Sequence, residues 1–263
     1  MRIKETATIV SQEKLCRDVY SLRISTKAAE YASAGQFISL YPNSDSKLLP
    51  RPISICEIDD SVRPGQLRLV YRVAGEGTRE FSSLKPGDTI EILGPNGNGF
   101  APFCEMTKDK GTKALLVGGG IGIPPMVELA KTLSCDVTVV AGYRSADDMF
   151  LTGELEREGR LIIATDDGSC GISGTVIDAI KEEKVSADVI FACGPRPMLR
   201  GIKSYAEENG ILAYVSMEER MACGIGACLG CVCESVNEDD HSRVKNKRVC
   251  ADGPVFPVSE VVL

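Results

Sequence analysis

One cysteine-rich stretch near the end of the chain constrains its fold more than any other feature. Four of the eleven cysteines lie between residues 223 and 233, in the sequence CGIGACLGCVC. The spacing C-x4-C-x2-C, followed further on by Cys250, is the plant-type pattern in which four thiolates hold a [2Fe-2S] cluster. Glycine and alanine fill most of the gaps, so the backbone can wrap closely around a cluster and aim its N–H groups at the sulfurs. The stretch therefore predicts an iron–sulfur site with Cys223, Cys228 and Cys231 among its ligands.

A hairpin is expected to supply the fourth ligand. The polar run 237–242 indicates a turn, and folding there would bring Cys250 opposite Cys231. Cys233 lies two residues beyond Cys231, roughly 6 to 7 Å further along the strand, so we expect it to be a spare thiol. His241, the only histidine, falls on this turn and is expected to be a solvated loop residue. A structural zinc site and a disulfide knot are alternatives, although C-x4-C is a less usual zinc spacing than paired C-x2-C.

The length and charge of the chain limit its partners. A chain of 263 residues with 43% hydrophobic content can form two domains and a small appendage. A net charge of −7 gives no attraction to nucleic acid or to anionic membranes. The cysteine content, with no signal peptide, indicates a reducing compartment, and the longest low-polarity run (114–127) is too short and irregular to span a bilayer. We therefore expect a cytoplasmic, soluble protein with neither nucleic acid nor membrane as a partner.

The first part of the chain has the pattern of an antiparallel β-barrel. Short alternating segments are separated by turn residues at the spacing typical of a closed or nearly closed barrel. The expected strands are residues 6–10, 19–24, 36–40, 53–58, 66–73 and 89–93.

Two short motifs in this part suit a phosphate-bearing ligand. Arg51 and Ser54 in RPIS place a guanidinium fork, suited to a pyrophosphate, near a hydroxyl that can reach a polar ring atom. Gly77 and Thr78 open an expected helix at 79–84, whose free N–H groups could hold a phosphate. Taken alone, the second motif is also compatible with an ordinary strand end capped by threonine.

From residue 111 onward, strands and helices alternate, which predicts a doubly wound parallel sheet with helices on both faces. The glycine run that follows the first strand has Gly118 and Gly120 at G-x-G-x-x-G positions, but Ile123 replaces the last glycine. The expected strands are 113–117, 136–142, 161–165, 188–193 and 213–216, and the expected helices are 124–133, 152–158, 175–183 and 197–209.

The ligand of such a sheet lies off the carboxyl ends of its strands. Three of these ends carry loops of small and polar residues, at 118–122, 166–169 and 193–197, which should converge on one crevice. The residues expected to face a nicotinamide nucleotide there are Gly118, Gly119, Gly120, Gly122, Asp166, Cys193 and Gly194.

Together these motifs resemble the ferredoxin-NADP reductase-like flavoprotein superfamily, which has R-P-x-S, G-x-G-T, G-G-G-x-G and C-G-P motifs. The segments SMEERMACGIGACLGCVC (216–233) and VCADGPVF (249–256) make the chain more closely similar to the electron-transfer subunits of NAD-dependent dihydroorotate dehydrogenases. The resemblance extends over essentially the whole chain. With the patterns above, it implies an FAD-binding antiparallel β-barrel (1–103), an NAD-binding α/β domain (111–215) and a small [2Fe-2S] domain (216–263).

The resemblance also assigns ligands. It implies that FAD is held by Arg51, Pro52, Ile53, Ser54, Tyr71, Arg72, Val73, Gly77 and Thr78. It implies that the [2Fe-2S] ligands are Cys223, Cys228, Cys231 and Cys250. No side chain is expected to be catalytic, because the cofactors carry the chemistry; Cys193 is either a nicotinamide contact or a structural cysteine.

The function implied by this family is electron transfer in pyrimidine biosynthesis. Electrons would pass from an FMN-containing dihydroorotate dehydrogenase catalytic subunit through the cluster and FAD to NAD+, in a heterotetramer of two plus two subunits. NAD is preferred over NADP because Asp166 and Asp167 would repel a 2′-phosphate, whereas Arg144 argues the other way unless nearby carboxylates engage it. The alternatives are a stand-alone NAD(P)H-dependent flavin and iron–sulfur reductase with another redox partner, and a zinc-bearing adaptor without enzymatic activity.

Overall fold

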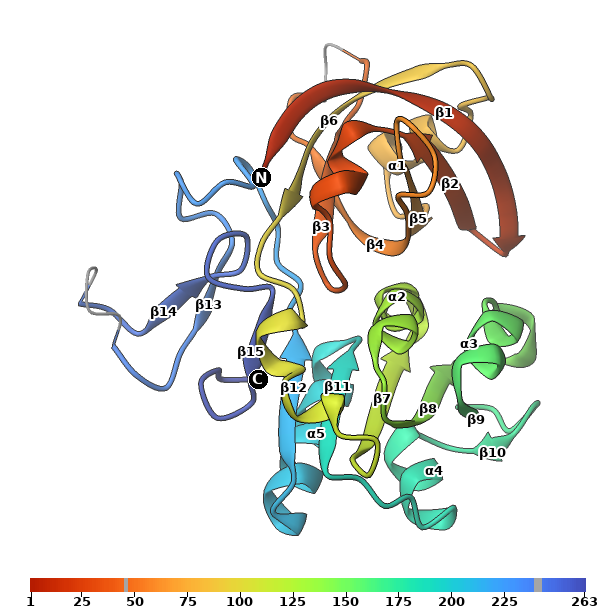
Figure 1. Ribbon diagram of the computed structural model, residues 1–263, viewed down its shortest axis with the longest axis vertical. Coiled ribbons are helices and arrows are strands. Elements are labelled where there is room, and N and C mark those ends of the chain that lie inside the picture. Colours follow the sequence, from red (N-terminus) through yellow and green to blue (C-terminus); the bar gives the residue numbers. More distant parts are fainter. Residues whose placement is uncertain (45–46, 239–242) are drawn as a thin grey trace.

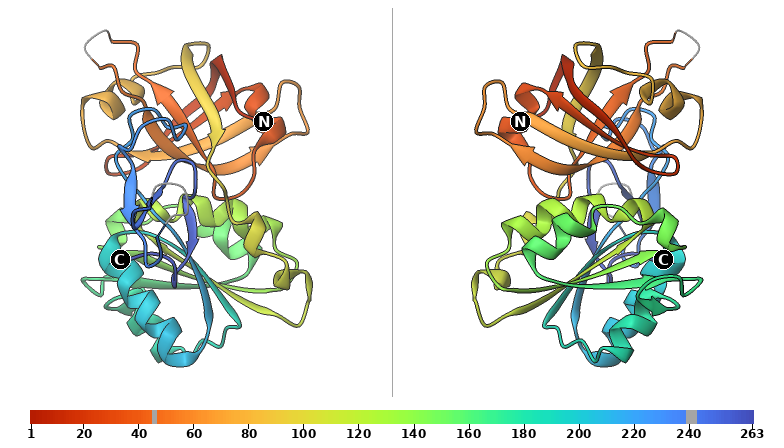
Figure 2. Two further views of the ribbon diagram at one scale, coloured as in Figure 1. Left: turned by 90° about the vertical axis from the view of Figure 1, so that its left-hand side faces the viewer. Right: turned by 90° about the vertical axis from the view of Figure 1, so that its right-hand side faces the viewer.

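The protein is seen in a computed structural model that describes residues 1–44, 47–238 and 243–263. A β-barrel lies above an α/β unit, and the C-terminal segment runs along one side and touches both (Figure 1). The side views show the same stacking of barrel and sheet along the long axis (Figure 2). Within the described residues, no helix is both long enough and apolar enough to cross a membrane.

Six antiparallel strands close the barrel in the order β1-β2-β5-β4-β3-β6. Alternation decides which side chains fill it: in β3, Ile38 and Leu40 point into the barrel core, whereas Phe37 packs outside it. The barrel strands are β1 (Ile3–Cys16), β2 (Val19–Ser25), β3 (Phe37–Tyr41), β4 (Arg51–Asp59), β5 (Gln66–Arg72) and β6 (Thr89–Asn96).

The predicted strands are confirmed here, but the bounds of several elements were wrong, most clearly those of β1 and α1. β1 has 14 residues rather than the expected five, because it continues as an exposed ribbon paired with β2. The helix α1 (Glu76–Phe81) begins three residues before the predicted start, since Gly75 is its N-cap and Thr78 lies in its first turn.

The α/β unit is the predicted parallel sheet with helices on both faces. α2 and α3 pack on one face and α4 and α5 on the other, each pair with its own buried core. The elements are β7 (Lys113–Gly119), α2 (Pro124–Thr132), β8 (Asp136–Tyr143), α3 (Thr152–Glu158), β9 (Arg160–Thr165), β10 (Ile172–Ser173), α4 (Val176–Glu182), β11 (Val189–Cys193), α5 (Arg196–Asn209) and β12 (Leu212–Ser216). Short 3-10 helices are η1 (Lys27–Tyr31), η2 (Ala101–Phe103), η3 (Met106–Lys108), η4 (Gly120–Gly122) and η5 (Ala146–Asp148).

The C-terminal segment contains the predicted hairpin, β13 (Val232–Glu234) with β14 (Asn246–Arg248). Its register differs by one residue from the prediction: Cys231 lies opposite Val249, whose N–H donates to the Cys231 carbonyl at 3.0 Å. Cys250 therefore follows the residue that faces Cys231. The middle of the predicted turn, with His241, lies outside the described residues.

A strand that was not predicted, β15 (Val255–Pro257), joins this segment to the α/β unit. It pairs antiparallel with β12 and completes the sheet in the order β10-β9-β8-β7-β11-β12-β15. The same segment also contacts the barrel, because the Asn98 N–H donates to the Gly253 carbonyl at 2.6 Å. The cysteine-rich segment is thus fixed to both larger parts of the molecule.

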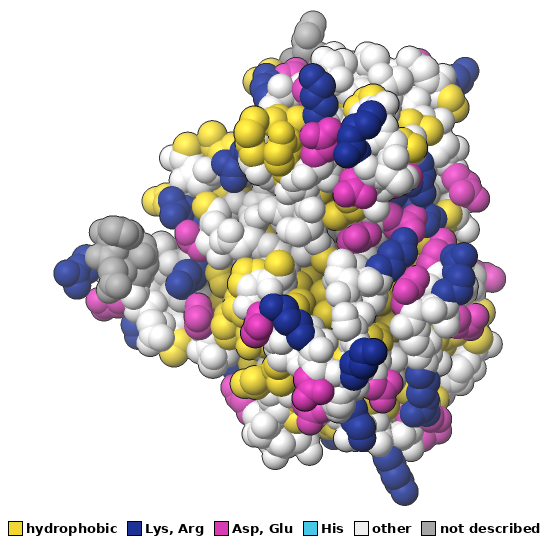
Figure 3. Space-filling model, viewed as in Figure 1, with side chains coloured by type: hydrophobic (Ala, Val, Ile, Leu, Met, Phe, Trp, Pro, Cys, Tyr) yellow, Lys and Arg dark blue, Asp and Glu magenta, His cyan; other side chains and the backbone are white. Residues whose placement is uncertain are grey.

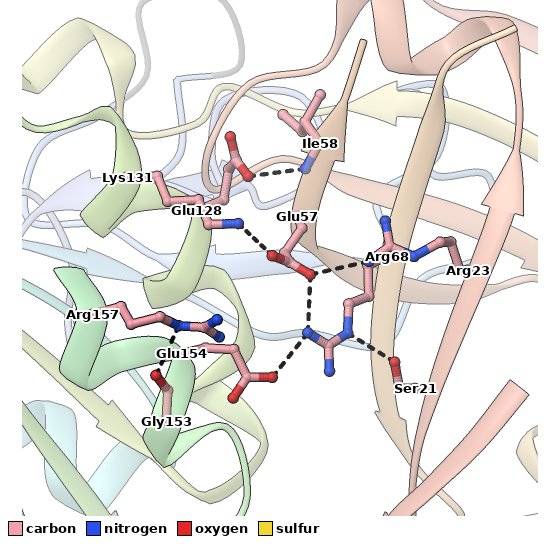
Figure 4. Close-up of polar contacts among 10 residues, drawn as sticks. All are labelled: Ser21, Arg23, Glu57, Ile58, Arg68, Glu128, Lys131, Gly153, Glu154 and Arg157. Atoms are coloured by element: carbon pink, nitrogen blue, oxygen red, sulfur yellow. Dashed lines mark hydrogen bonds and ion pairs between the residues drawn. The ribbon is translucent and has the colours of Figure 1, made fainter. Parts of the chain in front are cut away.

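A network of charged side chains joins the barrel to the helices beneath it (Figure 4). Glu57 on β4 accepts hydrogen bonds from Arg68 of β5, at 2.9 Å, and from Lys131 of α2. Arg68 also donates to Glu154 of α3 at 3.1 Å. These contacts cross between the two parts, so they fix the barrel relative to the α2 and α3 face of the sheet.

Candidate functional site

A cavity of about 1260 Å³ lies between the barrel and the carboxyl ends of the parallel strands. Most residues predicted from the nucleotide motifs are on its wall. They are Arg51, Pro52, Ile53, Ser54, Tyr71, Arg72, Thr78, Gly119, Gly120, Gly122, Asp166, Cys193 and Gly194. Val73, Gly77 and Gly118 are not part of the wall. The barrel motifs and the strand-end loops thus face one common space.

Arg51 and the first turn of α1 form a place that suits a phosphate. The Arg51 guanidinium lies against Gly77, where an added Cβ would be only 2.7 Å from its Nε. Thr78 Oγ1 accepts hydrogen bonds from the N–H groups of Ala74 and Gly75 at 3.0 and 3.2 Å. The Thr78 hydroxyl therefore stabilises the turn. Arg51 Nη1 donates to the Leu49 carbonyl at 2.5 Å, and the rest of the guanidinium lies beside the start of α1, where it suits an anion.

Tyr71 and Arg72 contribute differently, although they are neighbours on β5. The Tyr71 ring packs in the barrel core, and burial raises the pKa of its hydroxyl to about 12 despite a hydrogen bond from Gln12. Arg72 reaches across to the α/β unit, with its Nη2 3.8 Å from the position of a Cβ on Gly120. Arg72 can therefore serve a phosphate on either side of the cavity.

On the nicotinamide side, Cys193 ends β11 and its thiol is hydrogen-bonded to Ser216. Burial raises the pKa of this thiol to about 12, so it is neutral near pH 7 and unsuited to act as a nucleophile or base.

Asp166 and Asp167, the two carboxylates that bear on the choice between NAD and NADP, differ in their surroundings. Asp166 is exposed and lines the cavity. The Asp167 carboxylate accepts hydrogen bonds from Ser169 N–H and Oγ at 3.0 and 2.6 Å, and so closes its own turn. Arg144 also lines the cavity, and no ion pair joins it to Asp147 or Asp148 in the part of the chain that the structure describes.

One wall of the cavity was missed by the sequence analysis. Residues 216–221 line it directly after β12, and Glu219 in this stretch forms an ion pair with Arg196 at the start of α5. The sequence could have indicated this wall, because the stretch follows the carboxyl end of a parallel strand, as the three predicted loops do.

The cysteine-rich segment directs backbone N–H groups at all four predicted ligand thiols. Cys223 Sγ accepts from Ile225 and Cys228 at 3.5 and 3.4 Å, Cys228 Sγ from Gly230 at 3.5 Å, Cys231 Sγ from Cys250 at 3.4 Å, and Cys250 Sγ from Gly226 at 3.1 Å. N–H groups pointed at sulfur are what a negatively charged iron–sulfur cluster requires, so the donor set fits one. Among the described residues, no three Cys, His, Asp or Glu side chains are grouped around a single metal position.

The thiols differ in burial and in acidity. Burial opposes ionisation of Cys223, but hydrogen bonds from Ile225 and Cys228 prevail and lower its pKa to about 6. Burial and the neighbouring Cys231 raise the pKa of Cys250 to about 12. Cys231 and Cys250 are buried, whereas Cys223 and Cys228 are only partly covered. One edge of the site thus faces the core and the other faces outward.

Comparison with known families agrees with this division of the chain. Residues 218–262 match the iron-sulfur cluster binding domain of dihydroorotate dehydrogenase B. Residues 6–100 match an oxidoreductase FAD-binding domain, and residues 116–204 match an oxidoreductase NAD-binding domain.

Related proteins match along the whole chain. A protein from Geobacillus sp. (strain WCH70), named dihydroorotate dehydrogenase B (NAD(+)), electron transfer subunit, is 43% identical over 268 residues, covering 100% of both chains. A protein of the same name from Listeria monocytogenes serotype 4a (strain HCC23) is 44% identical over 258 residues, covering 97% of each. The chain belongs to this family of electron transfer subunits.

A solved structure has the same architecture as this chain over almost its whole length. A chain from the NADH-dependent reduced ferredoxin-NADP oxidoreductase, described for flavin-based electron bifurcation, has a TM-score of 0.82 and 29% identity. The match covers 97% of this chain and 89% of that one. The matched domains confirm the predicted fold class and the predicted iron–sulfur, FAD and NAD cofactors of an oxidoreductase subunit.

Proposed function

We propose that this chain receives electrons one at a time at its cysteine-rich segment and delivers them in pairs to NAD+, as the electron-transfer subunit of a dihydroorotate dehydrogenase. The observation that carries the proposal is one cavity with flavin and nicotinamide motifs on opposite walls, in a chain whose four proposed cluster-ligand thiols each accept an N–H hydrogen bond. When bound, the cluster transfers single electrons, FAD collects two, and NAD+ takes up a hydride.

The barrel wall would hold FAD. Arg51 and the first turn of α1 suit its pyrophosphate, and Ser54 on β4 can donate to a polar atom of the flavin ring. The nine proposed FAD contacts are Arg51, Pro52, Ile53, Ser54, Tyr71, Arg72, Val73, Gly77 and Thr78; Tyr71 and Val73 would act mainly by shaping the barrel edge.

The strand-end loops would hold NAD. Glycines after β7 allow the nucleotide to approach the backbone, and Asp166 disfavours a 2′-phosphate. The proposed contacts are Gly118, Gly119, Gly120, Gly122, Asp166, Cys193 and Gly194. Cys193, as a neutral thiol, would shape the ring pocket without exchanging a proton.

The cluster ligands are proposed to be Cys223, Cys228, Cys231 and Cys250, with Cys233 as a spare buried thiol.

The proposed domains are 1–103, 111–215 and 216–263, and β15 of the third forms the edge of the second domain's sheet. All eleven cysteines are free, which supports a reducing, cytoplasmic location.

The proposed partner is an FMN-containing catalytic subunit that oxidises dihydroorotate, in an assembly of two plus two subunits. Partly covered ligands beside exposed Ile225 and Leu229 support an electron entry point on this surface. The surface seen in Figure 3 has interspersed acidic and basic side chains rather than a continuous basic patch of the kind that nucleic acid favours.

Reconstitution tests the proposal. The purified chain with its cofactors should oxidise NADH with an artificial dye, and adding the FMN-containing subunit should produce orotate from dihydroorotate with NAD+ as acceptor. Dye activity without orotate formation in the mixture would reject the partner assignment. In a parallel reaction, reduction of ferredoxin instead would favour the stand-alone reductase, to which the bifurcating relative also points.

A further inference from the structure

A buried polar pair on the barrel faces the cysteine-rich segment. Ser39 on β3 points away from the barrel core, because its neighbours Ile38 and Leu40 fill that core, yet Ser39 is 0% exposed. Asn96 at the end of β6 is also 0% exposed. What covers Ser39 includes Gly224, where an added Cβ would lie 2.9 Å from Ser39 Oγ and within 4 Å of no other described atom outside residues 223–225.

Both members of this pair have unused hydrogen-bonding capacity. Asn96 Nδ2 donates to the Leu93 carbonyl at 2.8 Å and to Ser39 Oγ at 3.2 Å. A flipped amide would set its oxygen against the Leu93 carbonyl, so the orientation of Asn96 is fixed. The proton of the Ser39 hydroxyl then has no acceptor among the described residues, and Asn96 Oδ1 is buried without a partner.

Buried polar groups in native proteins are almost always hydrogen-bonded, so the Ser39 proton is expected to have an acceptor that the described residues do not supply. Asn96 Oδ1 is itself an acceptor and needs a donor such as a buried water, so it says nothing about the partner of Ser39. The Ser39 proton cannot serve the open cavity, because neither Ser39 nor Asn96 is on the cavity wall. Ser39 Oγ instead lies against the backbone at Gly224, next to Cys223 and within the loop that carries two proposed ligands.

We propose that the Ser39 hydroxyl donates a hydrogen bond to a sulfur of the iron–sulfur cluster and thereby raises the cluster's reduction potential, with Asn96 as the residue that positions the hydroxyl. The inference rests on the proposed cluster site. A donor to sulfur stabilises the reduced form, which carries more negative charge, more than the oxidised form. Because Ser39 is opposite Pro52 of the flavin motif in the β3–β4 ladder, the same strand would link both redox sites.

The test is an EPR-monitored redox titration of the purified holoprotein, comparing the wild type with Ser39→Ala. At a fixed potential we expect the ratio of reduced to oxidised cluster to be about tenfold lower in the variant, which for one electron is a fall in reduction potential of about 59 mV. Asn96→Leu should change the potential in the same direction, because the hydroxyl loses the amide that orients it. Ser235→Ala is the matched control: Ser235 is 1% exposed in the C-terminal segment, but its hydroxyl already donates to the Asn237 carbonyl at 2.7 Å.

A second measurement separates this role from simple packing. Electron–nuclear double resonance of the reduced cluster in D2O should show one exchangeable-proton coupling fewer in Ser39→Ala than in the wild type or Ser235→Ala. An unchanged potential and unchanged couplings in a folded, fully loaded variant would overturn the proposal. Absence of any iron–sulfur signal from the wild type would instead reject the proposed cluster site.

Discussion

At the scale of single residues, two buried cysteines close to Cys231 are expected to behave differently. Cys250 accepts a hydrogen bond from Gly226, in the loop that carries Cys223, whereas burial and then Glu219 raise the pKa of Cys233. Losing an outer partner of a metal ligand weakens metal binding about 10–100-fold, so losing a ligand should cost at least that. Cys250→Ala should therefore lose most bound iron and Cys233→Ala should retain it, as measured by iron and sulfide per chain. Iron loss from Cys233→Ala alone would reverse the assignment.

Asp166 offers a test of nucleotide choice. Two unit charges in water interact by about 1 kcal/mol at 4 Å, so exchanging repulsion for attraction should favour a 2′-phosphate by about 2 kcal/mol. Asp166→Arg should thus raise the ratio of kcat/KM for NADPH over NADH by at least about tenfold. Asp167→Arg is the matched control, because Asp167 is engaged with Ser169 and does not line the cavity. Equal ratios in both variants would contradict the role given to Asp166.

At the scale of elements, the sequence predicted those helices and strands whose positions depend on residues within the element itself. Parallel strands such as β7 are buried apolar runs, and α3 was placed at both ends correctly. The start of α1 was misplaced because Thr78 lies within the first turn, where its hydroxyl accepts a hydrogen bond from Gly75 N–H. Helix propensity does not distinguish this position from one just before the helix. β15 was missed because three residues ending at Pro257 become a strand only by pairing with β12, some forty residues away.

The same division holds for the candidate site. RPIS, the glycine runs and the cysteine spacing carry their chemistry within a few residues, so their positions were predictable. The wall formed by residues 216–221 follows a parallel strand and could have been predicted in the same way, whereas the approach of Gly224 to Ser39 depends on how the C-terminal segment folds back against the barrel. No local pattern encodes such long-range contacts.

The charged network between barrel and helices should contribute measurably to stability. Breaking a fully buried ion pair costs about 3–5 kcal/mol, and partial exposure reduces this for Glu57, so Glu57→Gln should lower the free energy of unfolding by about 2 kcal/mol. Arg160 and Glu183 form an exposed pair, with 55% and 39% of their side chains accessible. Glu183→Gln is therefore the control, with an expected cost under about 1 kcal/mol in urea unfolding. Equal costs would show that the network is only a surface contact.

The network also predicts a pH dependence. Burial raises the pKa of Glu57, but hydrogen bonds from Lys131 and Arg68 outweigh burial and hold the pKa below its ordinary value. The stability from a carboxylate with a lowered pKa is present above its unfolded pKa, about 4.3, and is lost as pH falls through the folded value. The stability difference between wild type and Glu57→Gln should therefore shrink below about pH 4.3 in unfolding curves. A difference that grows on acidification would contradict this assignment.

At the scale of the whole molecule, the buried and exposed edges of the cysteine site give the electron path a direction. Cys231 and Cys250 lie in the core shared with the α/β unit, while Leu229, between Cys228 and Cys231, is 68% exposed. A large apolar side chain beside partly covered ligands suits a surface that a partner covers. Electrons would therefore enter at this edge and leave through the barrel and the cavity.

This arrangement predicts which surface leucine matters for assembly. Burial of a leucine side chain contributes about 1.5–3 kcal/mol, so Leu229→Ser should weaken binding of the FMN-containing subunit by at least about tenfold, as measured by titration calorimetry. Leu212 is 54% exposed at the opposite end of β12 from the segment that leads to the cysteines. Leu212→Ser makes the same chemical change away from the proposed interface and should leave the affinity within about twofold, since distant surface substitutions change free energies by about 0.5 kcal/mol or less. If Leu212→Ser weakened the complex as much as Leu229→Ser, the partner would not dock at the exposed edge of the cluster site, and electrons would have to enter the chain elsewhere.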